Sequence, residues 1–205
     1  MCNRINTPYL FSKDEKRVVE LHFRSHEDWG KGVFDALKAN IIQDLREKQS
    51  NKCCYCKMEL GYDIKQVDID HIIPKSVYPK FTFNERNLAL SCPPCNTYKG
   101  KKDVLHKAIV NYPRSGRNLK IVHAHFDNYF ECIKIHGVAI YEGLNSKGCD
   151  TIKKCKLFRL KSVIEKTKAA KEKESPISEL VEKLRNASPQ ERELLKDAIK
   201  DLVGI

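Results

Sequence analysis

The chain has 205 residues, of which 41% are hydrophobic and 32% are charged, as in a folded globular protein rather than a disordered or fibrous one. No apolar run approaches the ~20 residues that cross a bilayer, which argues against a membrane-spanning role. The formal net charge of +11, from 38 Lys and Arg against 27 Asp and Glu, favours a polyanionic partner such as nucleic acid.

The first residues lack the long apolar stretch of a secretory signal, so we expect a cytoplasmic protein with no membrane partner. Cytosolic thiols stay reduced, which makes a disulfide framework a poor explanation for the nine cysteines. We therefore interpret the cysteine spacing in terms of metal binding.

Residues 1–50 form the first predicted segment. Val19, Leu21 and Phe23 alternate with other residues, a pattern that predicts a short strand. Apolar residues then recur at helical spacing, which predicts an amphipathic helix over residues 33–49. The apolar positions of this helix are Phe34, Leu37, Ile41 and Leu45.

The next segment, residues 51–108, contains two Cys-x-x-Cys pairs. They are Cys53 with Cys56, and Cys92 with Cys95. Two such turns offer four thiolates to one tetrahedral ion, so they predict a closed structural zinc site. A redox dithiol would need a βαβ context, which is absent. The other five cysteines suit no metal spacing and are expected to be ordinary apolar residues.

The 35 residues between the two cysteine pairs exceed the spacing of a simple zinc ribbon, so they hold an insertion. Asp70 and His71 end an apolar strand in this insertion, which places an oxygen ligand beside a potential general base. Regular strand geometry points the two side chains to opposite faces, so they serve one site only if the strand twists or ends there. Asp68 is the rival carboxylate.

A second strand is expected over residues 88–91, leading into the second cysteine pair and a helix that starts near Cys95. Asn96 and Lys99 share one face of the first turn of that helix because they are three residues apart. The predicted unit is therefore two strands and a helix, held together by zinc.

These pieces resemble the HNH, or ββα-metal, nucleases, and in particular the branch with two flanking Cys-x-x-Cys pairs. The residues that carry the resemblance are Asp70-His71-x-x-Pro74, Asn87-Leu88 and Cys92-x-x-Cys95-Asn96-x-x-Lys99.

The resemblance implies an endonuclease that cuts DNA and leaves 5′-phosphate and 3′-hydroxyl ends. By similarity, Asp70 and Asn96 hold one Mg²⁺ or Mn²⁺, ions that prefer hard oxygen ligands. His71 takes a proton from the attacking water. Asn87 orients His71 or braces the loop, although it could also be a simple turn residue, with Asn84 close enough to compete. The expected nucleic-acid contacts are Lys99, Lys101 and Lys102; Lys99 could alternatively be just solvent-exposed.

Residues 109–174 are expected to form a basic extension. Two apolar-rich runs, residues 129–135 and 138–142, flank His136-Gly137, which predicts a β-hairpin with a tight turn. Residues 151–173 are expected to form one helix.

Other aromatic and histidine residues carry weaker expectations. His123 and His125 share one strand face and could form a second metal pair, but no third ligand is evident. Trp29 and the tyrosines are expected to be core or rim residues rather than platforms for stacking bases.

Residues 175–205 carry two helix-start patterns, Ser175-Pro176 and a capping box from Ser188 to Glu191. The apolar stripes that follow them are Ile177, Leu180, Val181 and Leu184, then Leu195, Ile199 and Leu202. Short amphipathic helices are not stable alone in water, so we expect a helical hairpin that docks on a copy of the chain or on a dedicated partner. Packing on residues 33–49 or 151–173 is the alternative.

The expected fold class is α+β, with a zinc-stapled ββα-metal core, an N-terminal helix, a later β-hairpin and C-terminal helices. The flanks also look similar to the HNH subunits of Septu-type antiphage systems, which implies a defence role beside an ATPase partner. Restriction-type and mobile-element HNH nucleases are alternatives. A non-catalytic, zinc-containing nucleic-acid-binding module is another, but such a module has no need of His71.

Overall fold

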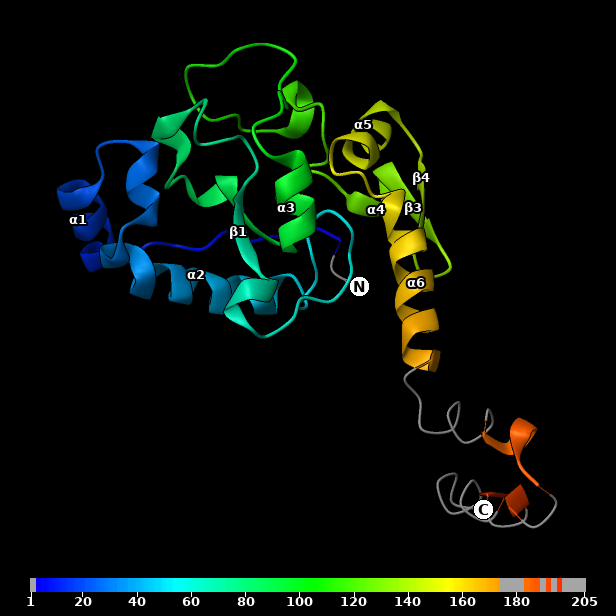
Figure 1. Cartoon of the computed structure of the whole chain (residues 1–205). Helices are drawn as coiled ribbons and strands as arrows, with labels where there is room; N and C mark the ends of the chain where they lie inside the picture. Colours follow the sequence, from blue (N-terminus) through cyan, green and yellow to red (C-terminus); the bar gives the residue numbers. More distant parts are fainter. Residues whose placement is uncertain (1–2, 174–182, 189–190, 193–194, 197–205) are drawn as a thin grey trace. The chain divides into compact units, whose positions relative to one another are not determined.

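The structure, a computed structural model, describes residues 3–173, 183–188, 191–192 and 195–196. It divides into two compact units, Met1–Phe158 and Arg159–Ile205. The first unit contains two small two-stranded sheets among helices (Figure 1). This combination confirms the α+β class, whereas the predicted segment boundaries at residues 50, 108 and 174 stay predictions. None of the described helices is both long and apolar enough to span a bilayer.

The first helix, α1, spans Lys13–His22, so the strand predicted at residues 19–23 is wrong. A capping box begins α1: the Ser12 hydroxyl accepts from the Glu15 amide at 3.2 Å, and the Glu15 carboxylate accepts from the Ser12 amide at 2.8 Å. These two bonds satisfy amide groups at the helix start. The cap therefore outweighs the local alternation, and Phe23 ends the helix instead of continuing a strand.

Helix α2 spans Asp35–Lys48 and confirms the predicted amphipathic helix. Leu37, Ile41 and Leu45 are buried along one face. The buried Gln49 side chain follows α2, accepting from the Leu90 amide at 2.7 Å and donating to the Leu90 carbonyl at 3.0 Å. This pair of bonds fastens the end of α2 to a strand far along the sequence.

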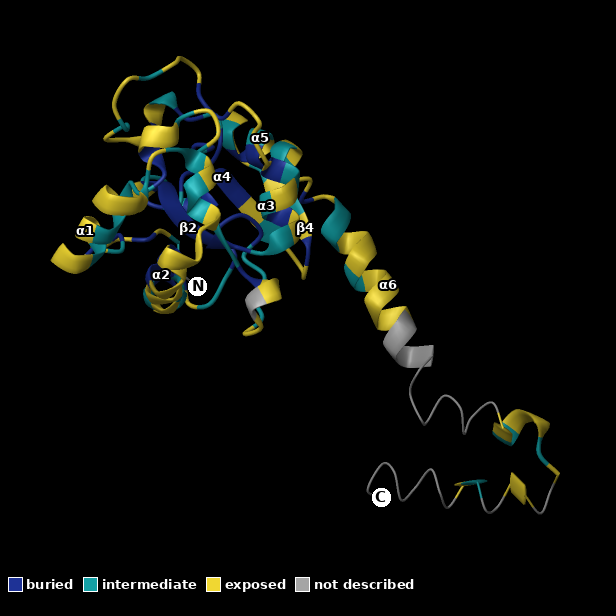
Figure 2. Ribbon diagram, turned by 60° about the vertical axis from the view of Figure 1, so that its left-hand side comes forward, coloured by how far each residue is buried: buried dark blue, intermediate teal, exposed yellow. Residues whose placement is uncertain are grey.

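The central pair of strands is β1, Asp68–His71, and β2, Leu88–Ser91. They are antiparallel, with Asp70 opposite Ala89 and His71 opposite Leu88. All four residues of β2 are buried, which places this strand in the core (Figure 2).

Helix α3, Pro93–Lys99, follows β2 directly. It begins two residues before the predicted start near Cys95, because proline suits the first position of a helix. Gly100 ends it with φ +49°, a conformation that favours glycine. Short 3₁₀ helices connect the elements of the first unit at His26–Gly30, Gly32–Phe34, Ile64–Gln66, Pro79–Phe81, Glu85–Asn87 and Gly116–Asn118.

The predicted β-hairpin is present as β3, Ile133–His136, and β4, Ile140–Gly143, with Gly137 at φ +56° in the turn. The first strand begins later than predicted, because Tyr129–Cys132 form the one-turn helix α4. Helix α4 buries the Tyr129 ring, whose hydroxyl donates to the Tyr55 carbonyl at 2.7 Å. An extended chain at these positions would lose that contact with the segment that carries the first cysteine pair.

The single helix predicted over residues 151–173 is wrong, since two helices occupy this region. Helix α5 spans Ser146–Lys154, and α6 spans Arg159–Lys173. Between them Lys156 adopts φ +50°, and the buried Cys155 and Leu157 side chains hold the break against the first unit's core.

The second unit contains α6 and short described helical pieces. The predicted capping box is present there, with the Ser188 amide 2.9 Å from the Glu191 carboxylate and the Glu191 amide 3.5 Å from the Ser188 hydroxyl. Most of the predicted tail hairpin, including Ile177, Ile199 and Leu202, lies outside the described residues.

Candidate functional site

The four predicted zinc ligands lie together. The sulfur atoms of Cys53, Cys56, Cys92 and Cys95 are all within 4.8 Å of one another. The Sγ atoms of Cys56 and Cys92 are 3.8 Å apart, which is about the ~3.8 Å edge of a tetrahedron with zinc–sulfur bonds of ~2.3 Å. The four residues therefore fit a structural zinc ion.

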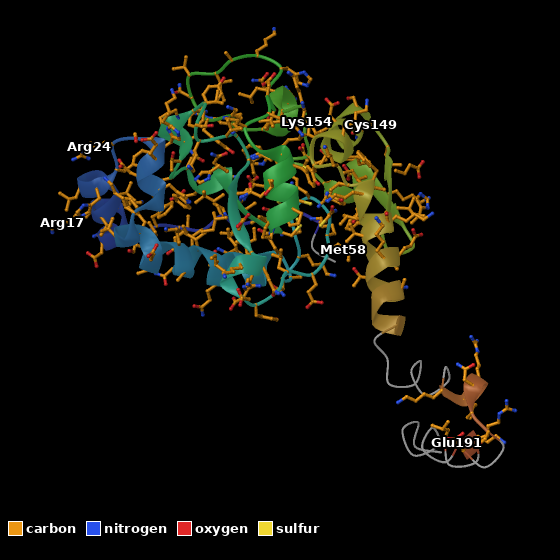
Figure 3. The ribbon with its side chains drawn as sticks, viewed as in Figure 1. Arg17, Arg24, Met58, Cys149, Lys154 and Glu191 are labelled. Atoms are coloured by element: carbon orange, nitrogen blue, oxygen red, sulfur yellow. The ribbon has the colours of Figure 1, made fainter. Side chains whose placement is uncertain are left out.

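Backbone contacts bring the two cysteine pairs together. The Cys54 amide donates to the Leu90 carbonyl at 2.9 Å, which fixes the first pair against β2. Cys92 is the N-cap of α3, so the second pair lies in the helix's first turn. Cys54 lies outside the cluster, as expected, and Cys149 is exposed (Figure 3).

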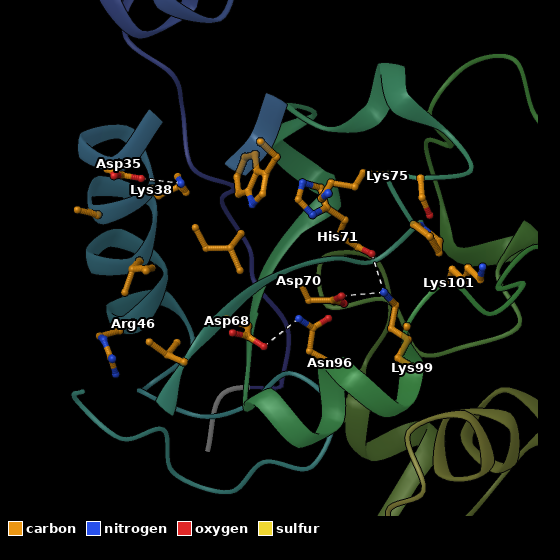
Figure 4. A pocket seen from close by; sticks show the side chains of 18 of the residues that line it. Asp35, Lys38, Arg46, Asp68, Asp70, His71, Lys75, Asn96, Lys99 and Lys101 are labelled. Atoms are coloured by element: carbon orange, nitrogen blue, oxygen red, sulfur yellow. Dashed lines mark hydrogen bonds and ion pairs between the residues drawn. The ribbon is translucent and has the colours of Figure 1, made fainter. Parts of the chain in front are cut away.

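Asp70 and His71 are the last two residues of β1, and their side chains point to different sides of the strand. The Asp70 carboxylate is 2% exposed and accepts from the Lys99 ammonium at 2.7 Å and from the Tyr55 hydroxyl at 2.5 Å. Lys99 also donates to the His71 carbonyl at 2.6 Å. Because the strand ends here, both side chains line one cleft (Figure 4).

The His71 ring is held in one tautomer. Its Nε2 lies 3.0 Å from the Thr82 carbonyl oxygen. A carbonyl can only accept, so Nε2 carries the proton and Nδ1 keeps a lone pair. Burial and the ammoniums of Lys75 and Lys99 lower the pKa of His71 to about 3. The ring is therefore neutral at physiological pH and able to accept a proton.

Asn87 is fully buried and clamps the two loops around His71. Its Oδ1 accepts from the Ile73 amide at 2.7 Å, and its Nδ2 donates to the carbonyls of Ile73 and Phe81, both at 3.0 Å. Phe81 precedes Thr82, the residue that holds the His71 ring. Asn87 was expected to orient His71, to brace the loop or to be a simple turn residue, and this geometry favours bracing. Asn84 caps the adjacent turn.

Three side chains could offer oxygen atoms to a divalent ion in the cleft. Asn96 Nδ2 donates to Asp68 Oδ2 at 2.9 Å, which leaves the Asn96 oxygen for another partner (Figure 4). Each Asp70 oxygen has one protein partner and two lone pairs, so each keeps a coordination position. The residues therefore fit a hard cation, with Asp68 as a third donor beside Asp70 and Asn96.

The three predicted phosphate contacts lie in different environments. Lys99 is 1% exposed and is bonded to Asp70, a geometry that favours a role in holding the site over contact with phosphate and excludes simple solvent exposure. The Lys102 ammonium donates to the Tyr98 and Lys154 carbonyls. Lys101 is exposed at the cleft. Lys101 therefore has the geometry best suited to the predicted contact.

Trp29 contacts the site, a feature that sequence reasoning missed. Its ring meets the His71 ring edge-on, with centroids 4.6 Å apart and planes at 83°. Tyr55 was also missed as a partner of Asp70, although it lies inside the first Cys-x-x-Cys motif. Both contacts depend on segments distant in sequence, so local patterns carry no indication of them.

In the part of the chain that is described, His123 and His125 belong to no group of three or more His, Cys, Asp or Glu side chains that could hold a metal ion. His123 Nε2 lies 2.8 Å from the Tyr112 hydroxyl, and His125 Nε2 lies 2.8 Å from the Leu88 carbonyl. Both rings are instead part of the buried polar core.

Residues 53–102 match the family model of the HNH endonucleases. The chain is also 34% identical over 109 residues to the Septu protein PtuB of Bacillus thuringiensis. That alignment covers 53% of this chain and 40% of the relative, so it spans less than half of that protein. No solved structure gives a significant match. The resemblance expected from the sequence is therefore confirmed.

Proposed function

We propose that the chain is a metal-dependent HNH endonuclease that hydrolyses DNA phosphodiester bonds and leaves 5′-phosphate and 3′-hydroxyl ends. The observation that carries this proposal is the His71 ring. It is neutral, fixed in one tautomer by Thr82, and lines the same cleft as Asp70 within the HNH-matching region. A module that only bound nucleic acid would have no use for this arrangement.

His71 acts as the general base in this proposal. Its Nδ1 accepts a proton from a water molecule as the water oxygen attacks phosphorus, and the 3′ oxygen leaves with the electron pair of its bond. The ring then carries a positive charge, which the Thr82 carbonyl stabilises by accepting from Nε2. An approaching phosphate would raise the pKa of His71 by its negative charge and make the ring a stronger base.

Asp70 and Asn96, with Asp68 beside them, would hold Mg²⁺ or Mn²⁺. When bound, such an ion polarises the phosphate and neutralises charge on the leaving oxygen. Lys99 fixes the Asp70 carboxylate through one oxygen. The structural zinc proposed for the cysteine quartet would join the first cysteine turn to α3, which carries Asn96.

The test removes the proposed general base, His71. His71→Ala is expected to lower the rate of DNA cleavage by about 10²–10⁴-fold while zinc content and DNA binding stay near wild type. His106→Ala, at an exposed histidine outside the cleft, is the matched control and should cut normally. Cleavage by His71→Ala at the wild-type rate, in a preparation free of other nucleases, would disprove the proposal.

We further propose a role in antiphage defence, which the similarity to a Septu protein supports. The proposed location is the cytoplasm and the proposed partner is an ATPase subunit. A partner or a second copy would dock through residues 175–205. Copurification from the native host tests this role: recovery of an ATPase supports it, and a chain recovered alone favours a restriction-type or mobile-element nuclease.

A further inference from the structure

We propose that the cleft accepts an unpaired nucleic-acid strand, with bases held against the separate rings of Trp29 and Tyr62 while a phosphate lies at His71. This inference rests on the proposed nuclease function and specifies its substrate. It concerns the side of the cleft opposite the HNH motif, which is supplied by α2 and the segments beside it.

The cleft has two chemically different sides (Figure 4). One side carries Asp68, Asp70 and His71 at the end of β1, with Asn96 from α3. The other side is supplied by α2, with Tyr62 beside Arg46, while the Trp29 ring lies next to both Lys38 of α2 and His71. A strand lying at His71 therefore also meets a surface that the HNH motif does not contain.

The size of the cleft suits a nucleotide. Its volume is about 980 Å³, which lies near the upper end of the ~300–1,000 Å³ range of pockets that enclose small molecules. Such a space admits a flexible strand of one or two nucleotides. A rigid duplex would instead contact only the rim.

The aromatic residues offer ring surface to a base. Tyr62 is 80% exposed, with the Arg46 guanidinium 5.0 Å from its ring centroid. Trp29 is half-buried, fixed by His71 and by Phe83, whose ring centroid is 5.2 Å away. Aromatic rings stack with any unpaired base, whereas the faces of bases in a duplex are already covered by their neighbours. These two rings therefore favour a single strand.

Positive side chains are placed to meet the phosphates of that strand. Arg46 is anchored by the Gly61 carbonyl at 2.8 Å, and Lys75 by the His26 carbonyl at 3.1 Å. Lys101 is exposed at the same cleft. A groove that combines such cations with exposed rings is typical of proteins that bind single strands.

Trp29 is the single tryptophan of the chain, so its fluorescence reports directly on the cleft. The experiment titrates the full-length wild-type protein, in magnesium-free buffer that prevents the proposed cleavage, with a single-stranded DNA oligonucleotide and with a blunt duplex of equal length. We expect the single strand to quench Trp29 emission and to bind at least about tenfold more tightly than the duplex.

Tyr62→Ala in the same background should weaken single-strand binding by about tenfold, since an exposed ring is removed without disturbing the core. Phe158→Ala, at a ring that is 65% exposed outside the cleft, is the control and should bind normally. Equal affinity for strand and duplex, binding without quenching, or normal binding by Tyr62→Ala would each overturn the inference.

Cleavage assays with the wild-type protein separate this inference from the proposed function. Cleavage of DNA that depends on His71, but without single-strand quenching, would overturn only the inference. Quenching and loss of affinity in Tyr62→Ala, without cleavage of any DNA by the wild type, would support the binding site and overturn the nuclease proposal.

Discussion

Buried hydrogen bonds to a few polar side chains determine the position of His71. The Tyr112 hydroxyl lies 3.2 Å from Asn87 Oδ1 and 2.8 Å from His123 Nε2, so the extension beyond the HNH-matching region reaches the clamp around His71. Asn87 is the centre of this network because it also bonds the Ile73 and Phe81 backbone. Its amide group satisfies both donors and acceptors, which an apolar residue cannot do.

Asn87→Ala should therefore be strongly destabilising. The change removes the Asn87 partner of the Ile73 amide and of the Ile73 carbonyl, and each unsatisfied group costs about 1–3 kcal/mol, whereas the Phe81 carbonyl still accepts from the Asn84 amide at 3.1 Å. We expect the free energy of unfolding, measured by urea denaturation, to fall by at least about 2 kcal/mol. Asn84→Ala, which removes one bond in a turn, should cost no more than about 1 kcal/mol. Equal losses in the two variants would contradict the bracing role.

Among the helices and strands, those whose position is set by neighbouring residues could be predicted from the sequence. The apolar period of α2 and the paired strands β1 and β2 followed from the sequence. The capping box of α1 at Ser12 and Glu15 did not enter our prediction, which rested on the alternation at residues 19–23. The break between α5 and α6 had no local indication, because Lys156 adopts φ +50° without a glycine or proline there.

The candidate site likewise has features that the sequence predicted and features that it did not. The adjacency of Asp70 and His71 and the cysteine spacing were visible in the sequence, since each is a short-range pattern. The burial of Lys99 against Asp70 was not, because it depends on how α3 packs beside β1. Trp29 likewise reaches His71 only through tertiary contacts.

The two cysteine turns and α3 are expected to fold as one zinc-dependent element. Cys92→Ser should lower the zinc content well below the expected one ion per chain and lower the melting temperature, because binding energy at a structural site is folding energy. Cys149→Ser, at an exposed cysteine outside the cluster, should change neither. Zinc is measured by mass spectrometry and unfolding by circular dichroism. A zinc-free wild type with the same melting temperature would disprove the structural role.

On the scale of the whole molecule, buried neutral histidines make stability depend on pH. Burial lowers the pKa of His71 to about 3 and of His125 to about 4, with nearby cations adding to the effect at both rings. Burial also holds the pKa of His123 well below its ordinary value. Unfolding exposes these rings to water, where their pKa returns to about 6.5.

The sign of the effect follows from proton binding. Below about pH 6.5 the unfolded chain binds protons that the folded chain excludes. The contribution of these histidines to the free energy of unfolding is therefore fully present above that pH and is lost as the pH falls toward 4 and 3. At pH 5 each such histidine removes about 2 kcal/mol relative to pH 7.5. We expect urea unfolding at the two pH values to show this loss, and His125→Gln to reduce the difference by about 2 kcal/mol. Zinc content measured in parallel separates this effect from acid release of the metal. An unchanged difference in His125→Gln would show that His125 does not contribute to the acid sensitivity.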